Sequence, residues 1–164
     1  MSVLPRATTP ALLQIDAVLG RLAGRPALQE VCRFLSESFD HYRWVGIYRL
    51  EERTLVLDAW DGPAETEHTR IPIERGICGQ AAREERTVIV DDVRTDPAYL
   101  ACFLETRAEI VVPIRDGGAV VGEIDIDGTE VRAFDASDRA FLERVAAKLG
   151  PSVRASAGSL GPPS

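Results

Sequence analysis

The sequence predicts an α+β domain in which helices cover an antiparallel sheet. Two helical segments come first, two pairs of strand-like runs follow, and a helical segment closes the ordered part of the chain. Strands joined by tight turns pair antiparallel, and this order of elements is typical of the α+β class. With 164 residues, of which 45% are apolar, the chain has the size of one domain with a single core.

Apolar residues at helical spacing predict two helices in the first part of the chain. The first spans residues 10–22 and the second spans residues 27–40, with Gly24-Arg25-Pro26 between them. Cys32 lies on the apolar stripe of the second helix, and we interpret it as a small core residue. Residues 1–9 are predicted to be disordered.

Two strand-like runs then predict a hairpin, over residues 44–50 and 54–60. Trp44 and Trp60 lie in these strands and are expected in the core, although a Trp at the mouth of a strand can also form the wall of a ligand site. Residues 70–73 are predicted to be extended.

Cys78 lies between two glycines, just before a helical stretch over residues 80–85. The dipole of a helix favours a thiolate at its N-terminus, and Arg75 is close in sequence. Cys78 can therefore be a thiol of lowered pKa, or a small residue that fits a tight turn. The sequence leaves both interpretations open.

Cys102 follows a predicted strand over residues 87–90 and lies in a short stretch, residues 99–103, that is predicted to be a helical turn. Apolar residues surround it in sequence. From these neighbours alone, a buried structural role is the favoured interpretation of Cys102.

A second hairpin is predicted over residues 109–115 and 119–127, because Asp116-Gly117-Gly118 is a strong turn signal. In its second strand, period-two alternation places Glu123, Asp125 and Asp127 on one face. A row of carboxylates is usually a solvated outer face. The rarer interpretation is a face that meets a cationic ligand.

Asp135 is a suitable N-cap for a last helix over residues 136–149, which Gly150-Pro151 is expected to end. The single domain is thus predicted over residues 10–150. Residues 151–164 are expected to form a flexible tail.

Charge and cysteine spacing narrow the classes of function. A net charge of −7 disfavours nucleic acid and anionic membranes as partners, and no run reaches the ~18 apolar residues of a membrane span, so a cytoplasmic protein is expected. The spacing of the three cysteines fits neither a CxxC pair nor a zinc ligand set. We expect free thiols, with no metal and no cofactor.

Five motifs in order closely resemble those of the free methionine-(R)-sulfoxide reductases, which are single GAF domains. The similarity covers residues 28–149, and it implies the six-stranded antiparallel sheet of a GAF domain and a homodimer. The motifs are Trp44-Val-Gly-Ile-Tyr48, Arg70-Ile-Pro-Ile-Glu-Arg-Gly-Ile-Cys-Gly79, Leu100-Ala-Cys102, Glu109-Ile-Val-Val-Pro113 and Asp125-Ile-Asp127.

The resemblance also implies an activity, the thiol-dependent reduction of free methionine sulfoxide with a thioredoxin-type reductant. Cys102 would be the nucleophile and Cys78 its resolving partner. The remaining site residues would be Trp44 against the methyl group of the substrate and three carboxylates that bind the amino acid and its sulfoxide group, namely Glu109, Asp125 and Asp127.

One position departs from the family pattern. The family has a third cysteine ten residues before the cysteine of the Gly-Ile-Cys-Gly motif, where this chain has His68. A stand-alone GAF sensor of small molecules or oxidation, without turnover, is therefore the alternative function.

Overall fold

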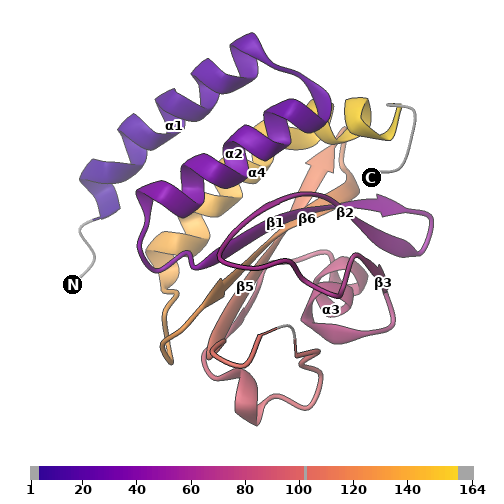
Figure 1. Cartoon of the computed structure of the whole chain (residues 1–164). Helices are drawn as coiled ribbons and strands as arrows, with labels where there is room; N and C mark the ends of the chain where they lie inside the picture. The colour runs from indigo at the N-terminus through magenta and orange to yellow at the C-terminus, as the bar shows by residue number, and fades with distance from the viewer. Residues whose placement is uncertain (1–3, 102, 159–164) are drawn as a thin grey trace.

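The fold is a six-stranded antiparallel sheet with helices on both faces (Figure 1). The computed structural model describes residues 4–101 and 103–158. Within them the strand order is β3-β2-β1-β6-β5-β4, and every neighbouring pair is antiparallel. The predicted α+β class with a six-stranded antiparallel sheet is confirmed.

The predicted order of helices and strands is present, with different ends for several elements. The helices are α1 (Leu4–Arg21), α2 (Gly24–Ser38), α3 (Gly76–Glu84), the short 3₁₀ helix η1 (Val93–Thr95) and α4 (Ala136–Ala157). The strands are β1 (Trp44–Glu51), β2 (Thr54–Asp61), β3 (Arg70–Pro72), β4 (Val88–Val90), β5 (Ala108–Asp116) and β6 (Ala119–Gly128). Both predicted hairpins, β1–β2 and β5–β6, are confirmed.

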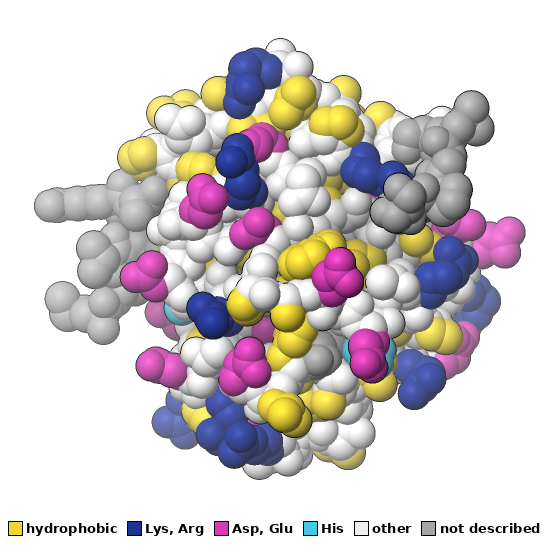
Figure 2. Space-filling model, viewed as in Figure 1, with side chains coloured by type: hydrophobic (Ala, Val, Ile, Leu, Met, Phe, Trp, Pro, Cys, Tyr) yellow, Lys and Arg dark blue, Asp and Glu magenta, His cyan; other side chains and the backbone are white. Residues whose placement is uncertain are grey.

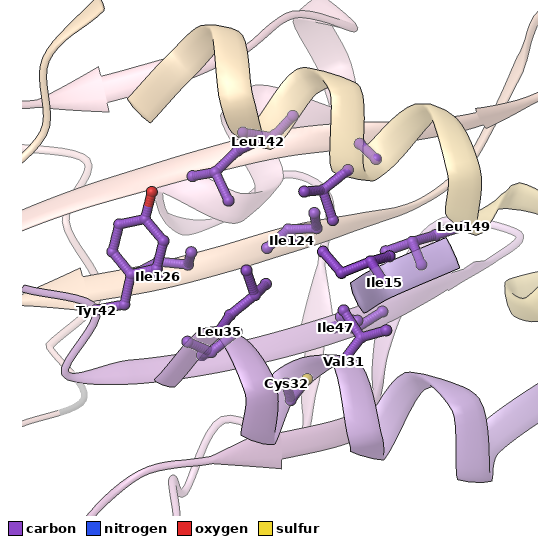
Figure 3. Packing of buried hydrophobic residues seen from close by; sticks show 14 of the residues in the cluster. Ile15, Val31, Cys32, Leu35, Tyr42, Ile47, Ile124, Ile126, Leu142 and Leu149 are labelled. Atoms are coloured by element: carbon purple, nitrogen blue, oxygen red, sulfur yellow. The ribbon is translucent and has the colours of Figure 1, made fainter. Parts of the chain in front are cut away.

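The main hydrophobic core lies between one face of the sheet and the helices α1, α2 and α4 (Figures 1 and 3). Ile124 and Ile126 of β6 face this core and are fully buried. Cys32 of α2 is also fully buried there, so its predicted role as a core residue is confirmed. Burial raises the pKa of this thiol far above its ordinary value, which makes Cys32 unreactive.

A second cluster lies on the opposite face of the sheet, where α3 and the segments around it cover the strands (Figure 1). Side chains that alternate with those of the main core point toward it, as period two requires. Its members include Trp44, Tyr48, Cys78 and Val111. The two central strands, β1 and β6, are thus covered on both faces.

The N-terminal helix is longer than predicted. It begins at Leu4, so the expected disorder of residues 1–9 is wrong for residues 4–9, and residues 1–3 lie outside the described part. Pro10, which was expected to start the helix, lies inside it. A proline there removes one backbone hydrogen bond without ending the helix, because Ala11 and Ile15 on the following turns are packed into the core.

The last helix is also longer, since α4 continues through Gly150-Pro151 to Ala157, and the predicted helix end is wrong. Gly150 lets the helix approach β5 closely, because a Cβ atom there would lie 2.5 Å from the Arg115 carbonyl oxygen. Beyond the proline, Val153 and Ser156 are each 1% exposed. Their burial outweighs the hydrogen bond that Pro151 cannot make.

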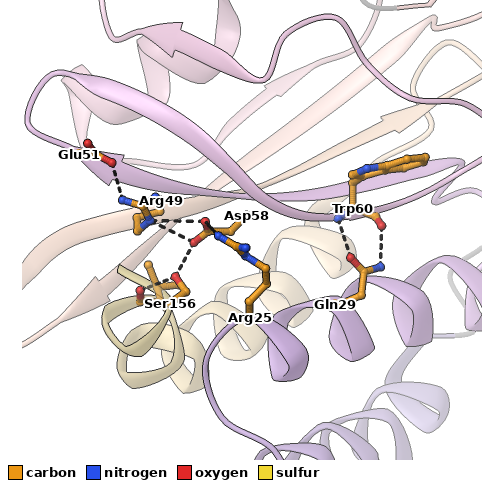
Figure 4. A network of polar contacts seen from close by, with 8 residues as sticks. Arg25, Gln29, Arg49, Glu51, Asp58, Trp60 and Ser156 are labelled. Carbon is orange, nitrogen blue, oxygen red and sulfur yellow. Dashed lines mark hydrogen bonds and ion pairs between the residues drawn. The ribbon is translucent and has the colours of Figure 1, made fainter. Parts of the chain in front are cut away.

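A polar network holds this final turn (Figure 4). The buried Asp58 of β2 accepts hydrogen bonds from the Ser156 hydroxyl and from Arg49, and Arg25 lies 3.7 Å away as an ion-pair partner. β2, α2 and α4 therefore meet at one carboxylate. Residues 151–157 belong to the folded domain, in contrast to the predicted flexible tail.

The helical turn predicted over residues 99–103 is absent from its described part, which is irregular. The turn occurs earlier, as η1, because the Asp92 side chain accepts a hydrogen bond from the Arg94 backbone N–H. Cys102 lies outside the described residues.

Among the helices that the structure describes, none combines the length and apolar character needed to span a membrane. On the face shown in Figure 2, acidic and basic side chains are interspersed.

Candidate functional site

Four carboxylates are buried on the sheet face that α3 covers. Glu109, Glu123, Asp125 and Asp127 are 5%, 0%, 3% and 3% exposed. The interpretation of β6 as a solvated face is therefore wrong. β6 is a central strand, and α3 with its flanking segments removes its acidic face from water.

The strand register determines what surrounds each carboxylate of β6. β6 lies between β1 and β5, so each of its residues has one neighbour on either side. The neighbours are Trp44 and Glu109 for Asp127, Gly46 and Val111 for Asp125, and Tyr48 and Pro113 for Glu123. Glu109 thus joins the row from the adjacent strand.

Cys78 faces this row from α3, in which it is the third residue. Its Sγ atom and one carboxylate oxygen each of Glu109 and Asp125 lie within 4.8 Å of one another. The same three residues line a small pocket together with Ile71, Gly76, Ile77 and Leu100. The structure thus brings together one thiol and two carboxylates that the sequence nominated, with Asp127 beside Glu109.

The carboxylates of β6 hold protons more strongly than carboxylates in water. Burial raises the pKa of Glu123 and of Asp127 well above their ordinary values, and the charge of Asp125 adds to both shifts. Burial also raises the pKa of Asp125, against the opposing effect of its hydrogen bonds with Glu109 and Cys78. The site therefore favours the protonated form of these carboxyl groups.

The thiol of Cys78 is weakly acidic, so the interpretation as a thiol of lowered pKa is wrong. Burial raises its pKa well above the ordinary value, and the charges of Asp125, Glu123 and Glu109 raise it further. Arg75, which was expected to favour the thiolate, is exposed. Three buried carboxylates act at closer range than one helix dipole.

Aromatic side chains line the site beside Asp127. The Trp44 ring stacks on Trp60 at 6.3 Å between centroids with 12° between the planes, and Phe103 lies 6.0 Å from Trp44. Gly46 and Gly62 make room for the Trp44 ring, since a Cβ atom on either would overlap it.

The backbone of Trp60 is held by a side chain of α2. The Gln29 side chain of α2 donates to the Trp60 carbonyl oxygen at 2.7 Å and accepts from its N–H at 3.4 Å (Figure 4). The stacked pair therefore lies at the open end of the β1–β2 hairpin, where β1 begins and β2 ends, and α2 fixes the backbone of Trp60.

His68 connects the site to the segment that leads to Cys102. Its Nε2 atom lies 2.9 Å from the Ala101 carbonyl oxygen, and its own carbonyl oxygen accepts a hydrogen bond from the buried Tyr48 hydroxyl at 2.8 Å. Its positive charge, when present, lowers the pKa of Asp125. His68 is thus a structural part of this region rather than a free loop residue.

Sequence reasoning left two members of the site without a role, namely Glu123 and Phe103, and expected Trp60 mainly in the core. Period two had already placed Glu123 on the face of Asp125 and Asp127, so that signal was available. The position of Trp60 at the mouth of a strand was a weak signal for a ligand wall. Phe103 gave no signal, because its contact with Trp44 depends on the course of the chain between strands.

Comparisons with known proteins show which proteins this chain is similar to. The model of the GAF domain family matches residues 26–153. Two relatives are named free methionine-R-sulfoxide reductase. The protein from Escherichia coli is 32% identical over 74% of this chain and 73% of its own, and the protein from Saccharomyces cerevisiae is 40% identical over 66% of this chain and 62% of its own.

A solved structure described as free methionine-R-sulfoxide reductase from Neisseria meningitidis in complex with its substrate is also similar. It superposes with a TM-score of 0.86 and 34% identity, over 96% of this chain and 94% of that chain.

Proposed function

The chain belongs to the GAF domain family and, within it, to the free methionine-R-sulfoxide reductases, and from this we propose that it reduces free methionine-(R)-sulfoxide to methionine with Cys102 as the nucleophile.

The observation that carries the proposal is a row of buried carboxylates beside an aromatic wall. Among the described residues, no ion pair involves Glu123, Asp125 or Asp127. Buried acids without a cationic partner destabilise a fold, so a ligand that brings the cation is the physical reason to keep them. The ammonium group of a free amino acid is such a cation.

The sulfoxide end of the substrate fits the aromatic side of the site. The Trp44 ring offers an apolar surface for the methyl group, with Trp60 and Phe103 behind it. The buried Nε1–H of Trp44 has no hydrogen-bond partner in the described part of the chain. A sulfoxide oxygen is a strong acceptor for such a donor.

The reaction then proceeds by nucleophilic attack. The thiolate of Cys102 forms a bond to the sulfoxide sulfur, and a protonated carboxyl group of the row gives its proton to the sulfoxide oxygen. The S–O bond breaks as that oxygen passes to Cys102. The products are methionine and a Cys102 sulfenic acid, so sulfur of the substrate is reduced and sulfur of the enzyme is oxidised.

Cys78 would close the cycle as the resolving thiol. Its proton passes to a neighbouring carboxylate, such as Asp125, as Sγ attacks the sulfenic sulfur. The S–O bond of the sulfenic acid breaks, and the carboxyl group passes the proton on to the departing hydroxide, so that a Cys78–Cys102 disulfide forms and water leaves. A dithiol reductant of the thioredoxin type restores both thiols. We further propose that the protein works in a reducing compartment such as the cytoplasm, where a dithiol reductant is available, and, as the family resemblance implies, that it forms a homodimer.

The direct test is incubation of the reduced protein with a mixture of the R and S epimers of free methionine sulfoxide and with a dithiol. We expect the R epimer to disappear and the S epimer to remain. Cys102→Ser should abolish the reaction, whereas Cys32→Ser, which changes a core thiol far from the site, should retain it with some loss of stability. Equal turnover by wild type and Cys102→Ser would rule out the proposed nucleophile.

Peptide mapping after treatment with the substrate, without reductant, tests the second half of the cycle. The Cys78–Cys102 linkage is expected. A linkage that contains Cys32 would contradict the assignment of the resolving thiol, and no turnover with either epimer would favour a GAF sensor instead.

A further inference from the structure

The thiol and two of the carboxylates are arranged for a second kind of ligand. The Cys78 Sγ atom and one oxygen each of Glu109 and Asp125 lie within 4.8 Å of one another, and all three residues are buried. They come from α3, β5 and β6. We propose that these three side chains bind a thiophilic divalent cation such as Zn²⁺.

The donor set fits this class of metal. Zn²⁺ binds thiolate sulfur at about 2.3 Å and carboxylate oxygen at about 2.0–2.2 Å, which places ligand atoms of a tetrahedral site roughly 3.5 Å apart. A rearrangement of about 1 Å in the side chains would bring the three donors to that spacing. A thiolate among the ligands selects Zn²⁺ and similar ions over Mg²⁺ and Ca²⁺.

An independent observation also indicates a cation at this position. Asp125 is 3% exposed, yet its Oδ1 atom has no hydrogen-bond partner within the described residues. Both carboxylate oxygens of Glu123, which is 0% exposed and raises the pKa of Cys78 through its charge, are likewise unpartnered there. Buried acceptors are nearly always satisfied, and a cation would satisfy them directly.

Binding replaces protons by the metal ion. The Cys78 thiol loses its proton as the sulfur–metal bond forms, and any protonated carboxyl group that becomes a ligand loses its proton too. Three protein ligands leave a fourth position for water. The ion would occupy carboxylates that the proposed function assigns to the substrate ammonium, so it should inhibit turnover; that consequence alone rests on the proposed function.

Titration of the reduced full-length protein with Co²⁺, a spectroscopic substitute for Zn²⁺, tests the site without any catalytic assay. Binding of one ion per chain should produce an intense sulfur-to-cobalt charge-transfer band, which Zn²⁺ then removes by displacement. Cys78→Ser should lose the band. Asp125→Asn should weaken binding by roughly tenfold or more. Replacing a residue that only hydrogen-bonds to a metal ligand already lowers metal affinity by about 10–100-fold, and Asp125 is proposed as a ligand itself.

Controls separate the site from other thiols and from misfolding. Cys32→Ser, Cys102→Ser and the exposed Glu130→Gln should keep the band at full intensity, and circular dichroism should show that Cys78→Ser is folded. If Cys78→Ser unfolds, the isosteric Asp125→Asn carries the test. A band that survives Cys78→Ser, that disappears in Cys102→Ser, or that wild type never shows would overturn the proposal.

Discussion

The pKa of Cys78 is determined by burial and by the neighbouring carboxylates rather than by its place in the helix. Its position in the first turn of α3 favours a thiolate, but burial and the carboxylates of Asp125, Glu123 and Glu109 raise its pKa. A thiol of this kind is stable in the resting enzyme. The thiolate is the reactive form of a cysteine, so such a thiol needs a base to take its proton before it can react.

Replacement of Asp125 should therefore make Cys78 more acidic. In a background of Cys32→Ser and Cys102→Ser, only Cys78 contributes to the thiolate absorbance in the ultraviolet, so a pH titration reports its pKa. We expect Asp125→Asn to shift that titration to lower pH, because a negative charge beside the thiolate is removed. Glu130→Gln, an exposed change, should leave it in place. An unshifted curve for Asp125→Asn would mean that the carboxylates do not control the thiol.

Gly46 is one of the two glycines that make room for the Trp44 ring. A Cβ atom there would overlap the ring and would also lie 3.3 Å from the Leu57 Cδ1 atom. Gly46→Ala should displace the ring, lower stability by about 1–3 kcal/mol and raise the KM for the substrate.

Gly20→Ala is the matched control for Gly46→Ala. Nothing lies within 4 Å of a Cβ atom on Gly20 in α1, so alanine there should raise helix stability by up to about 1 kcal/mol and leave the KM unchanged. Thermal unfolding and steady-state kinetics of both variants measure these effects. A normal KM in Gly46→Ala would show that Trp44 does not form the substrate wall.

The last helix is stabilised from both sides of its proline. Val153 is 1% exposed and lies in the main core beyond Pro151. Val153→Ala should cost on the order of 1–3 kcal/mol of unfolding free energy, since it removes two buried methyl groups and leaves a cavity. Val131→Ala, at a position that is 42% exposed, should cost under about 0.5 kcal/mol. Denaturant unfolding measures both, and equal values would mean that residues 151–157 do not contribute to the core.

The elements that the sequence predicted correctly are those whose signals are local. The turn Asp116-Gly117-Gly118 and the alternation along β6 predict the second hairpin and the shared face of its carboxylates. Pro10 and Pro151 misled the prediction, because distant packing overrides a local helix breaker. The raised pKa of Cys78 could not be predicted from its local sequence either, since it depends on carboxylates of strands that follow 30 or more residues later.

One face of the sheet holds the main core that stabilises the fold, and the other holds the candidate site. Helices α1, α2 and α4 cover one face of the sheet and α3 covers the other (Figure 1). The first face is apolar and holds the main core, while the second buries carboxylates that would be better solvated. Such a site lowers the stability of the empty protein. Ligand binding, whether of an ammonium group or of a metal ion, would recover part of that loss.

Stability should accordingly fall with rising pH through this cluster. The pKa of Glu123 is raised in the folded state above its ordinary 4.5, so the folded protein binds more protons than the unfolded chain above that pH. Its stabilising effect is complete below about 4.5 and is lost as the pH rises through the folded pKa.

Glu123→Gln should thus unfold at a higher temperature than wild type at pH 8, with a smaller difference at pH 4. Glu130→Gln should follow wild type at both values. A lower unfolding temperature for Glu123→Gln at pH 8 would show that this carboxylate stabilises the empty protein, which is the opposite of the effect that its burial predicts.

The most direct test of the ammonium site compares free methionine-(R)-sulfoxide with its N-acetyl derivative under identical conditions. Acetylation turns the ammonium into a neutral amide and leaves buried carboxylates unpartnered, which typically costs about 2–5 kcal/mol, or roughly 30-fold and more in kcat/KM. We predict rapid reduction of the free amino acid, hardly any of the N-acetyl form, and a smaller gap in Asp127→Asn than in Glu130→Gln. Equal kcat/KM values for the two substrates in the wild-type protein would contradict the assignment of Glu109, Asp125 and Asp127 to the amino group.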